Sequence, residues 1–243
     1  LANLEACEAN PALASQLNTE LPRRLAQLCK ENRRDVTRGG ARLVHISTDA
    51  VFDGTRGDYT ETDEPSPLGV YARTKLEAEW AVAEADPSAI IARINLFGWS
   101  MGGRRSLAEF FFNNLSAGKQ VMGFTDVIFC PLLANDIAHI LTRMLEMGLS
   151  GVYHTVGGEC LSKYEFGVRL AERFGLDAGL ITPTSVQQGG LTAVRAPNLS
   201  LRTEKLAQAL GESLPRLSPA LERFYTLYQQ GYPQMIQGLR GKG

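Results

Sequence analysis

The chain has 243 residues, of which 44% are hydrophobic and 21% charged, so an intrinsically disordered polypeptide is excluded. Its 25 basic and 26 acidic side chains give a formal net charge of -1, which excludes a global field that would hold nucleic acid or an anionic membrane. No stretch approaches the roughly 18 apolar residues of a membrane helix, and the first residues lack the pattern of a secretion signal. We therefore expect a cytoplasmic protein without nucleic-acid or membrane partners.

Strand and helix patterns alternate along the first part of the chain. Leucines and alanines at helical spacing predict helix over residues 11–32, with Pro22 dividing a short helix from a longer one. The apolar run 41–48 predicts a buried parallel strand, which a long loop connects to a predicted helix at 68–85. A second apolar run follows at 88–95, so these elements form a βαβ unit.

The alternation continues and predicts an α/β fold with a doubly wound parallel sheet. After about residue 157 the pattern changes to helices separated by loops, which indicates a smaller mixed lobe packed on the sheet. The further elements are predicted helices at 106–117, 135–147, 163–174, 202–210 and 218–230, and a predicted strand at 151–156.

Four cysteines are scattered along the chain, without a Cys-x-x-Cys pair and without a histidine at metal-ligand spacing. They are Cys7, Cys29, Cys130 and Cys160. This distribution predicts reduced structural thiols and no metal site.

Polar residues at two places carry the candidate chemistry. Ser47, Thr48 and Asp49 stand at the carboxyl end of the first strand, where open α/β sheets bind their ligands. Tyr71 and Lys75 lie four residues apart, on one face of the following helix. We expect the ammonium to lower the pKa of the phenol and make it a better proton donor. With a threonine hydroxyl on the same oxygen, this set would polarise a carbonyl and protonate the alkoxide formed when a hydride arrives.

A Tyr-x-x-x-Lys pair can also arise by chance on a protein surface. Its context favours the catalytic interpretation, because the pair follows a strand that ends in Ser-Thr-Asp and a loop that is long, acidic and rich in turns.

The tract STDAVFDG, together with residues 67–71 and 74–79, resembles the extended short-chain dehydrogenase/reductase superfamily, and within it the dTDP-4-dehydrorhamnose reductases. The resemblance extends from residues 7–18 to residues 195–206. It implies reduction of the 4-keto group of a nucleotide-linked deoxysugar, of the dTDP-4-dehydro-L-rhamnose to dTDP-L-rhamnose type, with NADP(H) or NAD(H) as cofactor.

The resemblance also implies a role for each candidate residue. The catalytic set is Tyr71, Lys75 and Thr48; the cofactor set is Tyr71, Lys75 and Ser47; the substrate set is Thr48, Asp49 and Arg195. Residues 1–157 would be the remainder of a dinucleotide-binding Rossmann domain, with substrate-lobe insertions near 97–130, and residues 158–243 a C-terminal substrate-binding lobe. In many superfamily members the helices that correspond to 11–32 and to the Tyr71 helix pair two subunits, so a homodimer is expected.

The glycine-rich turn that binds a pyrophosphate at a helix N-terminus is absent from the sequence. The first glycine is Gly39, and no later glycine completes the motif before a helix. We therefore expect an N-terminally incomplete copy of a longer reductase, without roughly the first 60 residues and their strands.

Two alternative functions stay open. The absent turn favours a non-catalytic subunit that resembles the regulatory β subunit of methionine adenosyltransferase, whereas Asp49 favours the reductase. A nucleotide-sugar epimerase or dehydratase would use the same triad with bound NAD. Ala50 and the tract Arg93-Ile94-Asn95-Leu96 depart from the reductase pattern, so the sequence does not define the sugar.

Overall fold

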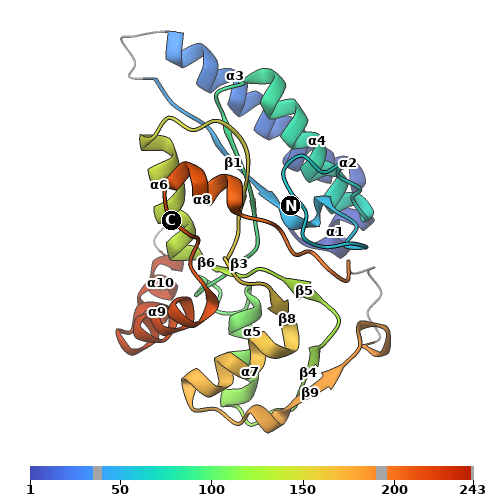
Figure 1. Ribbon diagram of the computed structural model, residues 1–243, viewed down its shortest axis with the longest axis vertical. Helices are drawn as coiled ribbons and strands as arrows, with labels where there is room; N and C mark the ends of the chain where they lie inside the picture. Colours follow the sequence, from blue (N-terminus) through green and yellow to red (C-terminus); the bar gives the residue numbers. More distant parts are fainter. Residues whose placement is uncertain (35–39, 190–195, 242–243) are drawn as a thin grey trace. The chain divides into compact units, whose positions relative to one another are not determined.

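The computed structural model describes residues 1–34, 40–189 and 196–241 (Figure 1). The chain divides into two compact units, each of which gathers separate segments. The first takes its described residues from 1–94, 139–155 and 196–213, and the remainder forms the second. Residues 95–138 thus belong to the second unit, and residues 196–213 belong to the first.

The first unit contains a three-stranded parallel sheet in the order β1-β2-β7. These strands are β1 (Val44–Thr48), β2 (Ile90–Ile94) and β7 (Gly151–Thr155). Thr48 pairs with Ile94, and Ile94 pairs with Thr155, so the carboxyl ends of the strands are level. Every residue of the central strand β2 is buried, which explains why its sequence is apolar apart from Arg93.

Helices cover both faces of this sheet, so the predicted α/β class is confirmed (Figure 1). Helix α4 (Gly69–Ala85) connects β1 to β2 and packs on β1 and on α3 (Leu21–Arg34), while α8 (Glu204–Leu210) packs on β7. Ala26 of α3, Val82 of α4 and Ile91 of β2 share one buried cluster, so both helices pack against the sheet.

The N-terminal segment forms α1 (Leu4–Ala9) and α2 (Pro11–Ser15), and a π-helical turn, Gln16–Glu20, joins α2 to α3. The asparagines Asn3 and Asn10 cap α1 and α2 with their side chains. Pro22 was expected to divide two helices, but it lies in the first turn of α3, and the wide turn comes before it. A proline clashes with the carbonyl four residues earlier in a regular helix, and a π-turn at that place removes the clash.

The second unit is built from short strand pairs and helices around an aromatic core. Phe97, Phe111, Phe166 and Phe224 are buried in that core, mostly in edge-to-face contacts. The strand pairs are β3 (Leu96–Phe97) with β6 (Leu132–Leu133), β4 (Val121–Phe124) with β9 (Ile181–Thr184), and β5 (Ile128–Phe129) with β8 (Leu161–Ser162). The helices are α5 (Leu107–Ser116), α7 (Lys163–Phe174), α9 (Leu217–Gln229) and α10 (Tyr232–Gln237).

Helix α6 (Ala134–Glu146) directly follows β6 along the chain. No helix in residues 1–34, 40–189 or 196–241 has the length and apolar character to cross a membrane.

Cys130 and Cys160 form a disulfide in the second unit, so the prediction of reduced thiols is wrong for these two residues. Cys7 and Cys29 are free. The bonded cysteines are 30 positions apart and the segment between them includes α6 and β7, so spacing along the chain carries no sign of this spatial pairing.

Reduction of this disulfide is expected to lower the free energy of unfolding by about 2–4 kcal/mol, because the bond restricts the unfolded chain over 30 residues. Denaturant unfolding with and without a thiol reductant measures the difference. The variant that carries both Cys130→Ala and Cys160→Ala should show no further effect of the reductant. An equal unfolding midpoint in both conditions for the unmodified protein would contradict the prediction.

Candidate active site

The packing of α4 on β1 brings the predicted catalytic residues together in the first unit. Tyr71 occupies the first turn of α4 and Lys75 the next turn, and Thr48 is the last residue of β1. Thr48 lies near enough to the Tyr71 hydroxyl to act on the pKa of the phenol. The spacing of four residues therefore places the phenol and the ammonium on the face of α4 that meets the carboxyl end of β1.

The first turn of α4 is fixed by a carboxylate from α1. Glu8 Oε1 accepts a hydrogen bond from the Val70 backbone N–H at 2.7 Å. Gly69 adopts a φ of +78°, and a Cβ at this position would lie 2.6 Å from Glu8 Oε1. Glycine is therefore required for this approach, which secures the helix end that carries Tyr71.

The end of β1 is equally constrained. Thr48 Oγ1 accepts a hydrogen bond from the Ala50 backbone N–H at 3.2 Å and donates to Asp49 Oδ1 at 3.1 Å. These contacts cap a 3₁₀ turn at Asp49–Val51, in which Asp49 is buried. Thr48 is thereby held in one position beside the phenol, as a group that orients a substrate oxygen must be.

Burial raises the pKa of Tyr71, and the nearby Asp49 and Cys7 raise it further, whereas the hydrogen bond from Thr48 lowers it. The sequence predicted the opposite direction, with Lys75 as the cause. The expectation fails because desolvation disfavours the phenolate more than neighbouring groups favour it. A raised pKa keeps the phenol protonated at neutral pH, which a proton donor requires.

Lys75 is directed to the backbone of β1. Its Nζ donates a hydrogen bond to the carbonyl oxygen of Ile46 at 2.5 Å. Burial lowers the pKa of Lys75 to about 8, and the carboxylate of Glu79, one turn further along α4, acts in the opposite direction. The ammonium is thus close to its titration range at physiological pH.

The roles of two further predicted site residues stay predictions. The Ser47 hydroxyl donates a hydrogen bond to Glu79 Oε1, so its expected contact with a cofactor stays a prediction. Arg195 lies outside the described residues.

Charged residues that the sequence analysis did not select lie behind the site. Arg93 of β2 and Glu79 of α4 form a buried ion pair, with 2.7 Å between Arg93 Nη2 and Glu79 Oε2. A sequence signal was present, because Arg93 interrupts an apolar strand and Glu79 follows Lys75 by one helical turn.

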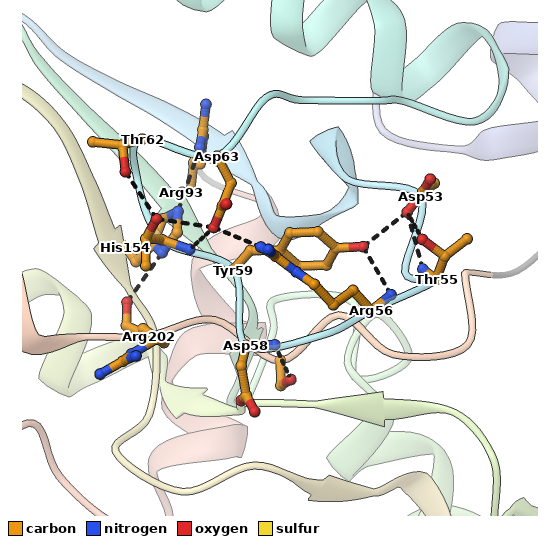
Figure 2. A network of polar contacts seen from close by, with 12 residues as sticks. Asp53, Thr55, Arg56, Asp58, Tyr59, Thr62, Asp63, Arg93, His154 and Arg202 are labelled. Atoms are coloured by element: carbon orange, nitrogen blue, oxygen red, sulfur yellow. Dashed lines mark hydrogen bonds and ion pairs between the residues drawn. The ribbon is translucent and has the colours of Figure 1, made fainter.

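The loop between β1 and α4 is organised by its own polar contacts (Figure 2). Tyr59 donates a hydrogen bond to Asp53 at 2.8 Å, and its ring stacks on Phe52 with centroids 4.2 Å apart. Arg56 lies over the same ring and forms an ion pair of 2.7 Å with Asp63. The long acidic segment is therefore an ordered structure that leads directly into the Tyr71 helix.

A family model described as RmlD substrate binding domain matches residues 2–230. The chain belongs to this family, whose members are extended short-chain dehydrogenases/reductases. It is 33% identical over 233 residues to the probable low-salt glycan biosynthesis reductase Agl14 of Haloferax volcanii, and the match covers 93% of this chain and 75% of that protein.

Other relatives carry two different names. A dTDP-4-dehydrorhamnose reductase of Mycobacterium tuberculosis is 32% identical, with 85% of this chain and 67% of the relative covered. The methionine adenosyltransferase 2 subunit beta of Rattus norvegicus is also 32% identical, with 86% of this chain and 62% of the relative covered.

A solved structure gives the same fold. The dTDP-4-dehydrorhamnose reductase of Bacillus anthracis, in complex with NADP, superposes with a TM-score of 0.82 at 23% identity, with 93% of this chain and 77% of that chain covered. The family and this likeness confirm the predicted Rossmann-like class.

Proposed function

We propose that the protein reduces the 4-keto group of a nucleotide-linked deoxysugar with NAD(P)H, of the dTDP-4-dehydro-L-rhamnose to dTDP-L-rhamnose type. The observation that carries the proposal is the proximity of Tyr71 and Thr48, with Lys75 one turn away, at the carboxyl end of the parallel sheet. Membership of the RmlD family and the reductase names of two relatives support the substrate class.

Each residue of the set has a task in this reaction. A bound reduced nicotinamide supplies a hydride to the carbonyl carbon. Thr48 turns its hydroxyl proton from Asp49 to the carbonyl oxygen and orients it, and Tyr71 transfers its proton to the same oxygen as negative charge develops there. Asp49, which follows Thr48, is expected to accept a hydrogen bond from a sugar hydroxyl beside the reacting carbon. The phenolate that remains is neutralised by a proton from solvent.

The described residues fit the nicotinamide-ribose end of such a cofactor. Within the described part of the chain, Ile46 O is the hydrogen-bond partner of Lys75 Nζ, and an ammonium has three donors. Lys75 can therefore hold the ribose hydroxyls while Tyr71 faces the reacting carbon. A glycine-rich turn for the pyrophosphate is not part of this sequence, so the fit concerns this end alone.

Replacement of Lys75 by Ala is expected to weaken NADPH binding by about 10- to 150-fold, because a hydrogen bond from a charged donor contributes about 1.5–3 kcal/mol. Turnover by the unmodified protein should fall as the pH rises through about 8, where Lys75 loses its proton. Fluorescence titration with NADPH and a pH profile of kcat measure the two effects. Unchanged cofactor affinity in Lys75→Ala would contradict the ribose role.

The assay that tests the proposal follows the loss of NADPH absorbance with dTDP-4-dehydro-L-rhamnose, with the dTDP-linked 4-hydroxy sugar as control. Turnover that requires the keto sugar supports the reductase. A second candidate function is favoured by the relative named as a methionine adenosyltransferase subunit, namely a non-catalytic partner of an enzyme. Absence of turnover, together with a stable complex with a methionine adenosyltransferase, would replace the first proposal with the second.

We also infer a homodimer through α3 and its neighbours. Leu17, Leu21 and Leu25 recur every fourth residue along this segment and are 41–47% exposed, and Trp80 on the adjacent α4 is 61% exposed. An apolar row of this kind is typical of a helix face that a partner covers.

Replacement of Leu25 by Glu is expected to convert the dimer into a monomer, because a charge at the centre of an apolar interface would be buried without a partner. Light scattering coupled to size exclusion gives the mass of each species. The variant Glu172→Gln, on an exposed position of α7 in the second unit, is the control and should remain dimeric. A monomeric unmodified protein would contradict the inference.

A further inference from the structure

The catalytic helix is fastened to the sheet by a buried polar cluster that takes no part in the reaction described above. The cluster consists of Ser47 on β1, Glu79 on α4, Arg93 on β2 and His154 on β7, each at most 4% exposed. It thus joins the three strands of the sheet to the single helix that carries Tyr71 and Lys75.

Glu79 is the centre of this cluster. Its carboxylate accepts a bifurcated hydrogen bond from Arg93 Nε, at 3.0 and 3.2 Å to its two oxygens, and another from Nη2 at 2.7 Å. It also accepts the hydrogen bond from the Ser47 hydroxyl. A carboxylate with three donors in a buried place has one defined position, so it fixes the rotation and the height of α4 on the sheet.

Arg93 is held from its other side. Its Nη1 lies 3.4 Å from His154 Nε2, and His154 Nδ1 lies 3.0 Å from the carbonyl oxygen of Arg202. Figure 2 shows His154 beside Arg93 and its dashed contact to Arg202. A neutral imidazole that donates through Nδ1 and accepts through Nε2 satisfies both contacts, and burial, the largest cause, lowers the pKa of His154 to about 4. The ring of Phe52 covers the guanidinium at 5.1 Å.

The cluster adjoins the candidate active site on both β1 and α4. Ser47 precedes Thr48 on β1, and Glu79 follows Lys75 by one turn on α4. The contact of Lys75 Nζ with Ile46 O is therefore followed, one turn along α4, by the contact of Glu79 with Ser47. Two side chains that are one turn apart on α4 thus contact two consecutive residues of β1.

We propose that Glu79 is a positioning residue of the reductase, which holds α4 in register on β1 through Ser47 and Arg93 so that Tyr71 meets Thr48 and Lys75 stays directed to the ribose. This inference rests on the proposed function. A buried ion pair adds little net stability compared with apolar residues of similar volume, so folding alone does not explain the pair of Glu79 and Arg93. The inference gives this pair a task in the reaction.

The groups around Lys75 show what a change at Glu79 would do. His45 on β1 is neutral, because burial and the Lys75 charge lower its pKa to about 3. Tyr71 lies on the same face of α4, and Asp49 and Cys7 act on Tyr71. Glu79 is the charged group that raises the pKa of Lys75 against burial. Loss of its charge therefore lowers the pKa of Lys75 below its present value.

The test compares Glu79→Gln, which keeps the shape but removes the charge, with Glu84→Gln on the exposed side of the same helix. In Glu79→Gln we expect kcat to fall on the order of 10- to 100-fold, with a smaller change in KM, because a displacement of about 1 Å of reacting groups can cost this much. The alkaline fall of the kcat profile should move to lower pH. In the Glu84→Gln control, kcat and the profile should stay as in the unmodified protein.

A second variant and a second readout keep the test decisive if Glu79→Gln folds poorly. Ser47→Ala leaves the ion pair with Arg93 intact but releases it from β1, and we expect a folded protein with a lowered kcat. Titration of the Lys75 ammonium by NMR in lysine-labelled protein, without cofactor and assigned by Lys75→Arg, should show a lower pKa in Glu79→Gln. An active unmodified protein whose Glu79→Gln and Ser47→Ala variants match Glu84→Gln would overturn the inference and leave the proposed function standing. An inactive unmodified protein would overturn the proposed function itself.

Discussion

Replacement of Tyr71 by Phe is expected to lower kcat by about 10²- to 10⁴-fold, while the affinity for NADPH stays within about threefold of its original value. The change removes only the hydroxyl, which is the proton donor in the proposed reaction. The ring remains and packs as before against Cys7 and Val70. Ground-state binding is preserved and transition-state stabilisation is lost, so the effect belongs to kcat.

Steady-state kinetics and a cofactor titration measure these two quantities for Tyr71→Phe. Tyr228→Phe, in the aromatic cluster of the second unit, is the matched control, because it removes the same atom from a partly exposed ring. Its kcat should be unchanged. Turnover of Tyr71→Phe equal to that of the control would remove Tyr71 from the proposed mechanism.

Replacement of Arg93 by Met is expected to lower the free energy of unfolding by about 3–5 kcal/mol, because it leaves a carboxylate buried without its partner. Arg93 is 3% exposed and Glu79 2% exposed, so solvent cannot replace the lost hydrogen bonds. Denaturant unfolding measures the loss. The double variant that combines Arg93→Met with Glu79→Leu should recover part of it, since no unpaired charge then remains in the core.

Arg202→Met supplies the comparison for Arg93→Met. The Arg202 guanidinium pairs with Glu204 on the surface, where both side chains are more than half exposed. Surface ion pairs contribute little, so the stability of this variant should be nearly unchanged. A loss in Arg93→Met no larger than in Arg202→Met would show that the buried pair does not stabilise the fold.

Strong local signals explain why much of the fold could be predicted from the sequence. The predicted helix at 163–174 coincides with α7, because Ser162 and Glu165 form a capping box and Gly175 ends the helix with a left-handed φ of +65°. The parallel strands at 41–48 and 88–95 were recognised from continuous apolar runs. The two-residue strands of the second unit are too short for any periodicity, and β4 pairs with β9 across 56 intervening residues.

The site shows the same division between local and tertiary information. Helical spacing was enough to predict that Tyr71 and Lys75 share a face, and the end of the strand was enough to place Thr48 beside them. The direction of the Tyr71 pKa shift depends on burial, and the partner of Ser47 depends on how α4 is rotated on β1. Neither follows from spacing, because both arise only when helix and sheet pack.

In the proposed reaction the protein moves a hydride to a sugar carbonyl while Tyr71 supplies the proton. The most direct measurement uses NADPH that carries deuterium at C4 of the nicotinamide, with dTDP-4-dehydro-L-rhamnose as acceptor and mass spectrometry of the sugar nucleotide. We expect a reduced product with one deuterium at the sugar C4 position, formed by the unmodified protein and strongly diminished with Tyr71→Phe. An unreduced sugar, or a product without the label, would contradict it.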